Sequence, residues 1–170
     1  MAQRLIATAD LSDAAGGGVA LDHRIRPVWR GASLQGRAFT VRTPAGQHPS
    51  VKHALELAAP GDVIVIDGEG GTERALWGDK MSAAAQERGI AGVVIFGACR
   101  DVGQIEELRF PVFAVTSVPT APLGDVDGET GVTIVCGGRT IAPGDLVVGD
   151  ADGVITIPQA VVEAVLARVV

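Results

Sequence analysis

The chain contains a series of short apolar runs rich in β-branched residues, each bounded by glycine, proline or aspartate. Runs of this kind are typical of buried strands, because valine and isoleucine pack well on a pleated surface and the bounding residues favour turns. We predict strands at residues 39–43, 92–96, 112–115, 132–135 and 154–157. The fold is therefore expected to be built around a β core.

Two further segments, residues 60–70 and 143–153, share one pattern. Each begins with Pro-Gly-Asp, continues as a short apolar run and ends in an acidic turn closed by glycine, with six identities in eleven positions. The pattern predicts a turn, a buried strand and a second turn. A duplication and a common turn-strand solution adopted twice account equally well for so short a similarity.

Helical patterns are fewer than strand patterns. We predict helices at about residues 11–16, 50–58, 80–88 (closed by Gly89) and 102–108, and a terminal helix from about Gln159. This mixture does not read as a regular alternation of strand and helix, so a doubly wound nucleotide-binding fold is disfavoured. The expected architecture is α/β or α+β: one domain over residues 1–170, with short central strands and flanking helices.

Composition excludes several classes of protein. A net charge of −6, the absence of tyrosine and only two tryptophans argue against a nucleic-acid partner. No apolar run reaches the roughly 18 residues that a membrane span needs, and no secretory signal opens the chain, so we expect a soluble cytoplasmic protein. The two cysteines, Cys99 and Cys136, each end an apolar run and are expected to be buried.

Charge is unevenly distributed along the chain. Residues 23–55 contain six basic residues, all three histidines and no acid, whereas residues 125–152 contain six acids and only Arg139 as a base. The two segments form either an ordinary solvated surface or complementary patches that meet between subunits of an oligomer.

The most informative stretch runs from Asp67 to Asp101. Its glycines at 68, 70 and 71 match neither nucleotide-loop pattern, so we interpret them as a mobile loop. Asp79 suits the N-cap of the helix that comes next, which would leave backbone N–H groups at Lys80 and Met81 free. A helix of about 15 Å and then a returning strand of about 16 Å bring Arg100 and Asp101 to the level of Asp79.

This arrangement can serve one kind of chemistry. Arginine can bind a carboxylate through two hydrogen bonds, helix N–H groups can bind further anionic oxygens, and aspartate is a hard ligand for Mg²⁺. A divalent ion beside a 2-oxo acid polarises the carbonyl and stabilises the enolate formed when the adjacent carbon–carbon bond breaks. A capping aspartate beside a surface Arg-Asp pair is the structural alternative.

The sequence also resembles a known family. Asp79, twenty intervening residues and then Arg100-Asp101, set in WGDKMSAAAQERGIAGVVIFGACRDV, resembles the D-x20-R-D motif of the RraA-like family, which includes the class II 4-hydroxy-4-methyl-2-oxoglutarate aldolases. ATADLSDA, FPVFAV and PGDLVVGDADGVITIP extend the similarity from Ala7 to Pro158. The resemblance implies a β-rich swivelling β/β/α fold and a homotrimer or dimer of trimers with sites between subunits.

The resemblance also implies roles for residues. Arg100 binds the carboxylate of the 2-oxo acid substrate, Asp101 coordinates Mg²⁺ or Mn²⁺, and Asp79 orients water on the metal. Lys80 and Met81 bind the substrate through backbone N–H groups, beside Gly78. The implied activity is a metal-dependent aldolase or oxaloacetate decarboxylase acting through a pyruvate enolate; the alternative is a non-catalytic regulator that binds a ribonuclease.

Other polar residues receive structural interpretations. His23, His48 and His53 lie outside the motif and are expected at surfaces or interfaces. Trp77 is expected to form a pocket wall. Asp67 and Glu69 are interpreted as turn residues that could also approach the metal.

Overall fold

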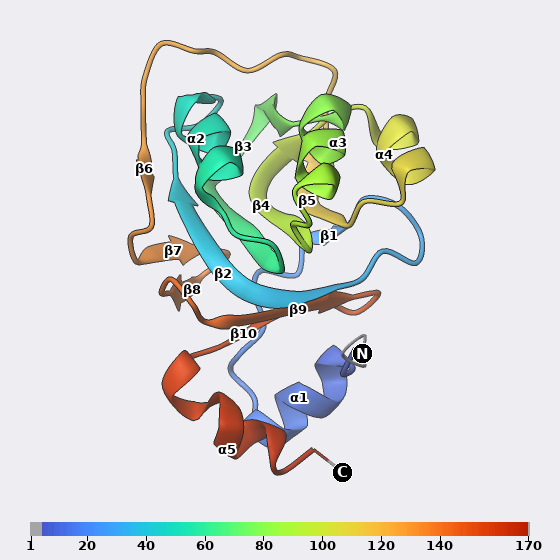
Figure 1. The fold of residues 1–170 in the computed structure, drawn as a ribbon, viewed down its shortest axis with the longest axis vertical. Coiled ribbons are helices and arrows are strands. Elements are labelled where there is room, and N and C mark those ends of the chain that lie inside the picture. Colours follow the sequence, from blue (N-terminus) through green and yellow to red (C-terminus); the bar gives the residue numbers. More distant parts are fainter. Residues whose placement is uncertain (1–4, 170) are drawn as a thin grey trace.

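The computed structural model describes residues 5–169 as an α/β fold built on one eight-stranded mixed sheet. The strand order is β1-β5-β4-β3-β2-β9-β10, with β6 paired to β2, and a separate pair, β7-β8, lies beside the sheet. Figure 1 shows the sheet curling between two groups of helices. The expected α/β class with flanking helices is confirmed.

The middle of the chain alternates strand and helix. The elements in order are β2 (Leu34–Arg42), α2 (Pro49–Leu57), β3 (Asp62–Trp77), α3 (Asp79–Glu87), β4 (Gly92–Cys99), α4 (Val102–Leu108) and β5 (Val112–Ser117). All three pairings among these four strands are parallel. The expectation of no regular alternation is therefore wrong for this segment.

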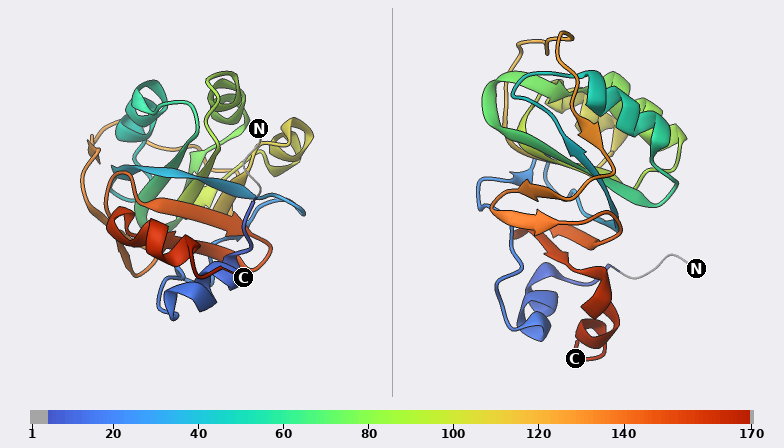
Figure 2. Two further views of the ribbon diagram at one scale, coloured as in Figure 1. Left: turned by 60° about the horizontal axis from the view of Figure 1, so that its bottom comes forward. Right: turned by 90° about the vertical axis from the view of Figure 1, so that its left-hand side faces the viewer.

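The doubly wound fold is nevertheless absent, because α2, α3 and α4 lie on the same face of the sheet (Figure 2). The opposite face is covered by strands from the C-terminal third of the chain. Each of these helices follows one of the parallel strands. All three therefore begin at the same edge of the sheet, where the carboxyl ends of those strands lie (Figure 1).

The remaining elements are short and antiparallel where they pair. They are α1 (Thr8–Ala15), β1 (Arg26–Pro27), β6 (Glu129–Thr130), β7 (Ile134–Cys136), β8 (Arg139–Ile141), β9 (Leu146–Asp150), β10 (Gly153–Ile157), a 3₁₀ turn (Gln159–Val161) and α5 (Val162–Leu166). Helices α1 and α5 pack together against β9 and β10, at the end of the molecule opposite α3 (Figure 1). The strand expected at residues 132–135 is replaced by β7, which begins later and pairs with β8.

Strand β3 is the longest element and the least regular. The predicted loop at Gly68, Gly70 and Gly71 is wrong, because β3 continues through these residues to Trp77. Its pairing with β4 shifts register repeatedly after Asp67, and Glu69 and Gly70 both have positive φ, at 58° and 68°. Bulges of this kind bend a strand and re-aim the side chains beyond them, and here they place the end of β3 beside the end of β4.

Three buried clusters stabilise this arrangement. One packs α2, α3 and α4 onto the sheet and includes Ile64, Ile66 and Ile95. The second fills the opposite face around Val65, Phe113 and Val147, and the third joins α1 and α5 to the sheet. Because successive residues of β3 point to opposite faces, its continuous apolar run serves the first two clusters at once.

The two Pro-Gly-Asp units occupy related places. One leads into β3 and the other into β9, and these two strands flank β2, β3 parallel to it and β9 antiparallel. Arg37 of β2 lies opposite both Asp62 and Leu146, so the two units start at the same level of the sheet. The predicted turn, buried strand and acidic turn are confirmed for residues 143–153, and the first turn and strand are confirmed for residues 60–70.

Candidate functional site

The candidate site lies where β3 and β4 end and α3 and α4 begin. The backbone N–H of Asp79 donates a hydrogen bond of 3.2 Å to Oδ2 of Asp101, 22 residues further along the chain. The same carboxylate oxygen lies 3.6 Å from Nε of Arg100. The structure therefore brings Asp79, Arg100 and Asp101 together, as the counting of helix and strand lengths predicts.

Helix α3 begins one residue earlier than expected. Gly78 occupies the N-cap position and Asp79 is the first helical residue, so the N-cap prediction for Asp79 is wrong. A Cβ atom on Gly78 would lie 2.5 Å from Oδ2 of Asp101. The backbone at Gly78 is extended, with φ of −153°, which suits any residue. The close approach of the Asp101 carboxylate is therefore what favours glycine here.

Two backbone features place Arg100 and Asp101. The N–H of Arg100 donates to the carbonyl of Trp77 (2.9 Å), which joins the ends of β4 and β3. Asp101 then adopts the left-handed conformation, with φ of 61°, and precedes the first residue of α4. Aspartate is among the few residues that tolerate this conformation. The side chains of Arg100 and Asp101 are 39% and 32% exposed, so both are accessible to a ligand.

Trp77 forms the floor of the site. Its indole Nε1 donates to Oγ of Ser82 (2.8 Å), and that hydroxyl donates to the carbonyl of Gly78 (3.0 Å). The ring stacks on Phe110 with a centroid separation of 6.3 Å. Trp77 is 2% exposed and lines the cavity, so the expectation of a pocket wall is confirmed.

The first turn of α3 offers fewer free donors than expected. The N–H of Lys80 donates to Oδ1 of its neighbour Asp79 at 2.7 Å. The N–H of Met81 has no acceptor among the described residues. A substrate oxygen would therefore meet the Met81 N–H directly, whereas the Lys80 N–H must first leave the Asp79 carboxylate.

These groups surround a cavity of about 370 Å³, which we call the Arg100 cleft. Its wall includes Gly78, Asp79, Lys80, Met81, Arg100 and Asp101, together with two residues of the α2 region, His48 and Lys52. The sequence predicted His48 at a surface or interface and indicated no role for Lys52. The available signal was their spacing of four residues, which puts both on one face of a helix.

His48 is held in the cleft in its neutral form. Burial lowers its pKa from 6.5 to about 4, with further lowering by the positive charges of Lys52 and Arg100. Its Nε2 lies 2.9 Å from the sulfur of Met81, which connects α2 to α3. At neutral pH the positive charge of the cleft therefore comes from lysine and arginine side chains.

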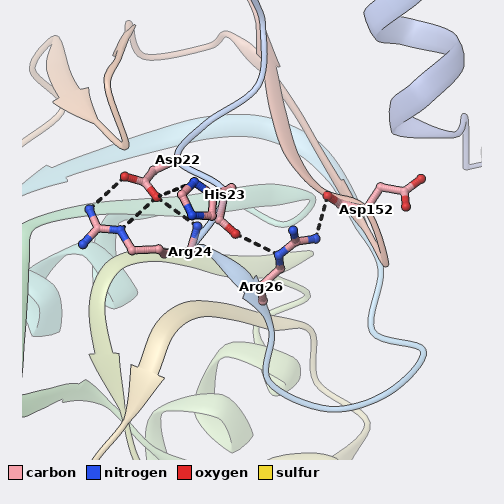
Figure 3. Close-up of polar contacts among 5 residues, drawn as sticks. All are labelled: Asp22, His23, Arg24, Arg26 and Asp152. Carbon is pink, nitrogen blue, oxygen red and sulfur yellow. Dashed lines mark hydrogen bonds and ion pairs between the residues drawn. The ribbon is translucent and has the colours of Figure 1, made fainter.

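The other candidate polar residues lie elsewhere. His23 belongs to a polar cluster near β1, in which the Asp22 carboxylate accepts from Arg24, and Arg26 donates to the carbonyls of His23 and Asp152 (Figure 3). These bonds close the loop before β1, and the Arg24 guanidinium lowers the pKa of Asp22. His23 is thus part of a surface loop.

Asp67 and Glu69 lie within β3 and accept hydrogen bonds from backbone N–H groups. Asp67 Oδ1 accepts from the N–H of Glu69 (3.0 Å), and Glu69 accepts from the N–H of Ala45 (3.2 Å). Neither residue lines the Arg100 cleft. Cys99 and Cys136 are buried as expected, and burial raises the pKa of the Cys99 thiol to about 12.

The basic and acidic segments contact each other within one chain. Arg42 pairs with Glu129, and His53 lies 3.8 Å from Asp127. These contacts join strand β2 and helix α2 to the segment around β6. Part of the charge complementarity seen in the sequence is therefore intramolecular.

The donor set is compatible with a divalent ion of the Mg²⁺ type. No group of three or more metal-binding side chains occurs within residues 5–169. Mg²⁺ keeps several of its waters and binds proteins through one or two carboxylates. Asp101 accepts a hydrogen bond through Oδ2, while Oδ1 accepts none from the described residues. One hard oxygen in an open polar cleft fits this preference.

Comparison with known proteins establishes the family. A profile of the RraA-like family (Aldolase/RraA) matches residues 8–156. A Halalkalibacterium halodurans protein provisionally named as a 4-hydroxy-4-methyl-2-oxoglutarate aldolase is 42% identical over 165 residues, which cover 97% of this chain and 79% of that protein. The chain therefore belongs to the RraA-like family.

Two further relatives carry different names. The 4-hydroxy-4-methyl-2-oxoglutarate aldolase of Thermus thermophilus is 32% identical over 89% of this chain and 92% of its own length. The structure of the RNA-processing inhibitor RraA from Thermus thermophilis superposes with a TM-score of 0.83 at 31% identity, over 92% of this chain and 94% of that one. Relatives within the family thus carry both an aldolase name and the name of an RNA-processing inhibitor.

Membrane insertion through a helix finds no support in the described part of the chain. None of the helices between residues 5 and 169 is both long enough and apolar enough to span a bilayer.

Proposed function

We propose that this protein is a carbon–carbon lyase that acts on 2-oxo acids with the help of Mg²⁺ or Mn²⁺. The observation that carries the proposal is the contact between the Asp79 N–H and the Asp101 carboxylate, beside the Arg100 guanidinium in an open cleft. This contact joins an anion-binding helix start, a carboxylate-binding cation and a hard metal ligand at one place.

Four residues of the cleft have defined tasks in this reaction. Arg100 binds the substrate carboxylate, and the free N–H of Met81 binds a second substrate oxygen. Asp101 holds the divalent ion, which when bound polarises the 2-oxo carbonyl and stabilises the negative charge that develops on its oxygen. Gly78 has no Cβ atom, so the Asp101 carboxylate can lie directly against the backbone at this position.

The electrons and protons balance without a further reactant. With oxaloacetate, the bond between C3 and the C4 carboxylate breaks, its electron pair moves to C3 and onto the 2-oxo oxygen, and carbon dioxide leaves. C3 then takes a proton, and pyruvate is released. Asp79 lines the cleft and orients the water that supplies this proton. With 4-hydroxy-4-methyl-2-oxoglutarate the bond between C3 and C4 breaks and the leaving group is a second pyruvate. Its 4-hydroxyl first loses a proton to water, and C3 then takes one proton from water, so the protons balance.

We propose further that the site is completed between subunits of a homotrimer or dimer of trimers. The partial exposure of Arg100 and Asp101 supports this arrangement. The same two residues also line a second cavity of about 330 Å³ with Ser117 and Pro119, which leaves room for a neighbouring chain.

The test is pyruvate formation from oxaloacetate and from 4-hydroxy-4-methyl-2-oxoglutarate, with Mg²⁺, with Mn²⁺ and with EDTA. We expect metal-dependent turnover that falls by at least roughly a thousandfold in Asp101→Ala and Arg100→Ala, because each removes a group that binds charge in the transition state. Turnover that is unchanged in both variants would refute the proposal.

An inactive protein would instead favour the regulatory alternative. In that case a ribonuclease should be captured equally by the wild type and by Asp101→Ala, since a regulator acts through its surface. Melting temperatures of the two proteins show whether the substitution has left the fold intact.

A further inference from the structure

The Arg100 cleft contains a second, separate cation that the proposed chemistry does not use. Lys52 lies on α2, in a different part of the chain from the Arg100 motif, yet both side chains line the same cavity. Among the described residues, Lys52 takes part in no ion pair. A cation without a protein partner at the wall of a substrate cleft is available to a ligand.

His48 lines the same cavity as Lys52 and Arg100. The positive charges of these two residues both contribute to lowering the pKa of its imidazole. His48 itself is neutral at pH 7, as its lowered pKa shows, and it contacts Met81 of α3. The cleft therefore presents two positive charges, from Lys52 and Arg100, and an uncharged imidazole.

Lys52 also marks the direction in which the cleft extends. A neighbouring cavity of about 400 Å³ shares His48, Lys52 and Pro122 with the Arg100 cleft and continues along α2 past His53 and Glu56. The two cavities meet at Lys52. Within this outer cavity His53 lies 3.8 Å from the Asp127 carboxylate. Lys52 has no carboxylate partner among the described residues.

Lys80 is the other lysine of the cleft, and it is less suited to the same task. It belongs to the first turn of α3, beside Asp79. It lines the Arg100 cleft and does not line the neighbouring cavity. A substrate that enters with one end bound at Arg100 and extends outward passes Lys52.

We infer that Lys52 binds the distal carboxylate of a dicarboxylic 2-oxo acid and makes the enzyme prefer dicarboxylic over monocarboxylic substrates. Arg100 and the start of α3 bind the 2-oxo acid end, and Lys52 recognises the other end. This inference rests on the proposed function for the orientation of the substrate. Lys52 is a specificity-determining residue, and it takes no part in breaking the bond.

The experiment compares two ligands of equal chain length that differ only at the far end. Dissociation constants of 2-oxoglutarate and 2-oxopentanoate are measured by calorimetry with Mg²⁺ present, for the wild type, Lys52→Met and Lys52→Arg. Methionine keeps most of the length of the side chain and removes its charge, whereas arginine restores the charge. Arg30→Met is the matched control, because Arg30 is an exposed cation in the loop after β1.

We expect the wild type to bind 2-oxoglutarate about tenfold more tightly than 2-oxopentanoate, because a charge-assisted hydrogen bond is added. Lys52→Met should lose this preference while binding 2-oxopentanoate as before, and Lys52→Arg should regain most of it. The preference should also weaken as salt increases, since the second cation is exposed. Arg30→Met should behave as the wild type does.

Two results would overturn the inference: a preference that survives in Lys52→Met, or an equal loss of binding for both ligands. Binding is measured without turnover, so the outcome is distinguishable from a failure of the lyase proposal. A lyase whose Lys52→Met variant keeps its preference would retain the proposed function and lose this inference. A protein that shows no lyase activity, but whose ligand preference depends on Lys52, would retain this inference and lose the proposed function.

Discussion

The two Pro-Gly-Asp units lie on either side of β2, and they begin in the same way. In each, the aspartate carboxylate accepts from the N–H of the residue three positions earlier, Ala59 for Asp62 (2.9 Å) and Ala142 for Asp145 (2.8 Å). Gly61 and Gly144 both have positive φ, at 86° and 91°. The shared sequence is therefore a shared turn.

The units also share one hydrogen bond after the apolar run, and only then do they differ. Asp67 accepts from the N–H two residues on, as Asp150 does, at 3.0 and 2.9 Å. After Asp150 the chain turns back and forms β10 as a hairpin. After Asp67 it bulges and continues alongside β4. The same local chemistry thus begins a structural hairpin in one place and a strand that ends at a functional site in the other.

In the comparison of the two units, the largest expected effect comes from a substitution just after the end of β3. Gly78→Ala places a Cβ atom against Oδ2 of Asp101. Because the carboxylate is the mobile end of a side chain, it can shift, so we expect little loss of stability. A shift of this kind disturbs the geometry on which turnover depends, and we expect kcat/KM to fall by about a hundredfold. Steady-state kinetics together with thermal unfolding measure both quantities.

The comparison substitution in the second unit is Gly149→Ala in β9, a position that does not correspond to Gly78, where the new Cβ atom would lie 3.0 Å from Cζ of Phe113. Here we expect a loss of about 1–3 kcal/mol in the free energy of unfolding, from overpacking, with normal kcat/KM in the folded protein. Equal effects of the two substitutions on activity would remove the distinction between the units.

A smaller effect separates the two turn aspartates. Asp145 accepts two backbone N–H groups, from Ala142 (2.8 Å) and Gln159 (3.0 Å), whereas Asp62 accepts one and lies 3.5 Å from the exposed Arg37. Hydrogen bonds to charged groups contribute about 1.5–3 kcal/mol each, and exposed ion pairs little. Asp145→Ala should therefore lower the free energy of unfolding by roughly twice as much as Asp62→Ala in urea titrations. A larger loss of unfolding free energy in Asp62→Ala would show that the number of backbone hydrogen bonds does not determine how much each turn contributes to stability.

The smallest expected effect is a pH dependence of stability that comes from His48 in the Arg100 cleft. The pKa of His48 is lowered from 6.5 to about 4 in the folded protein, so the unfolded chain binds more protons between these values. The contribution of the neutral imidazole is full above pH 6.5 and is lost as pH falls through about 4. Because water partly screens this half-buried ring, we expect about 1–2 kcal/mol.

Urea unfolding in EDTA, from pH 7 to pH 4.5, measures this contribution. His48→Gln cannot be protonated and should lose stability less steeply over the same range. An identical pH dependence in the two proteins would mean that other groups cause the acid sensitivity.

Much of this organisation could be predicted from local patterns. Apolar runs bounded by turn residues identified β2, β4, β5 and β10 at least in part, and residue counting brought Asp79 to Arg100 and Asp101. These predictions succeed because strand pairing and helix rise are regular. The charged residues of the motif meet as a direct result of that regularity.

The features that local patterns missed depend on contacts between distant segments. The glycines after Asp67 resemble a loop, and they form part of a strand only because β4 pairs with the bulged segment. Lys52 and His48 reach the cleft because α2 packs beside α3, with His48 against Met81. Packing of one helix on another leaves little trace in the sequence of either one.

The backbone bond from Arg100 to Trp77 joins the ends of β4 and β3, and the Trp77–Ser82–Gly78 hydrogen bonds join the end of β3 to the start of α3. None of these bonds uses the Asp79 or Arg100 side chain. The turn that presents the reactive groups is thus largely maintained by backbone atoms of those two positions that every residue except proline supplies, and by the side chains of Trp77 and Ser82. A descendant lineage can exchange its chemistry one side chain at a time and still inherit a folded protein. The same backbone frame can therefore present different side chains at these two positions.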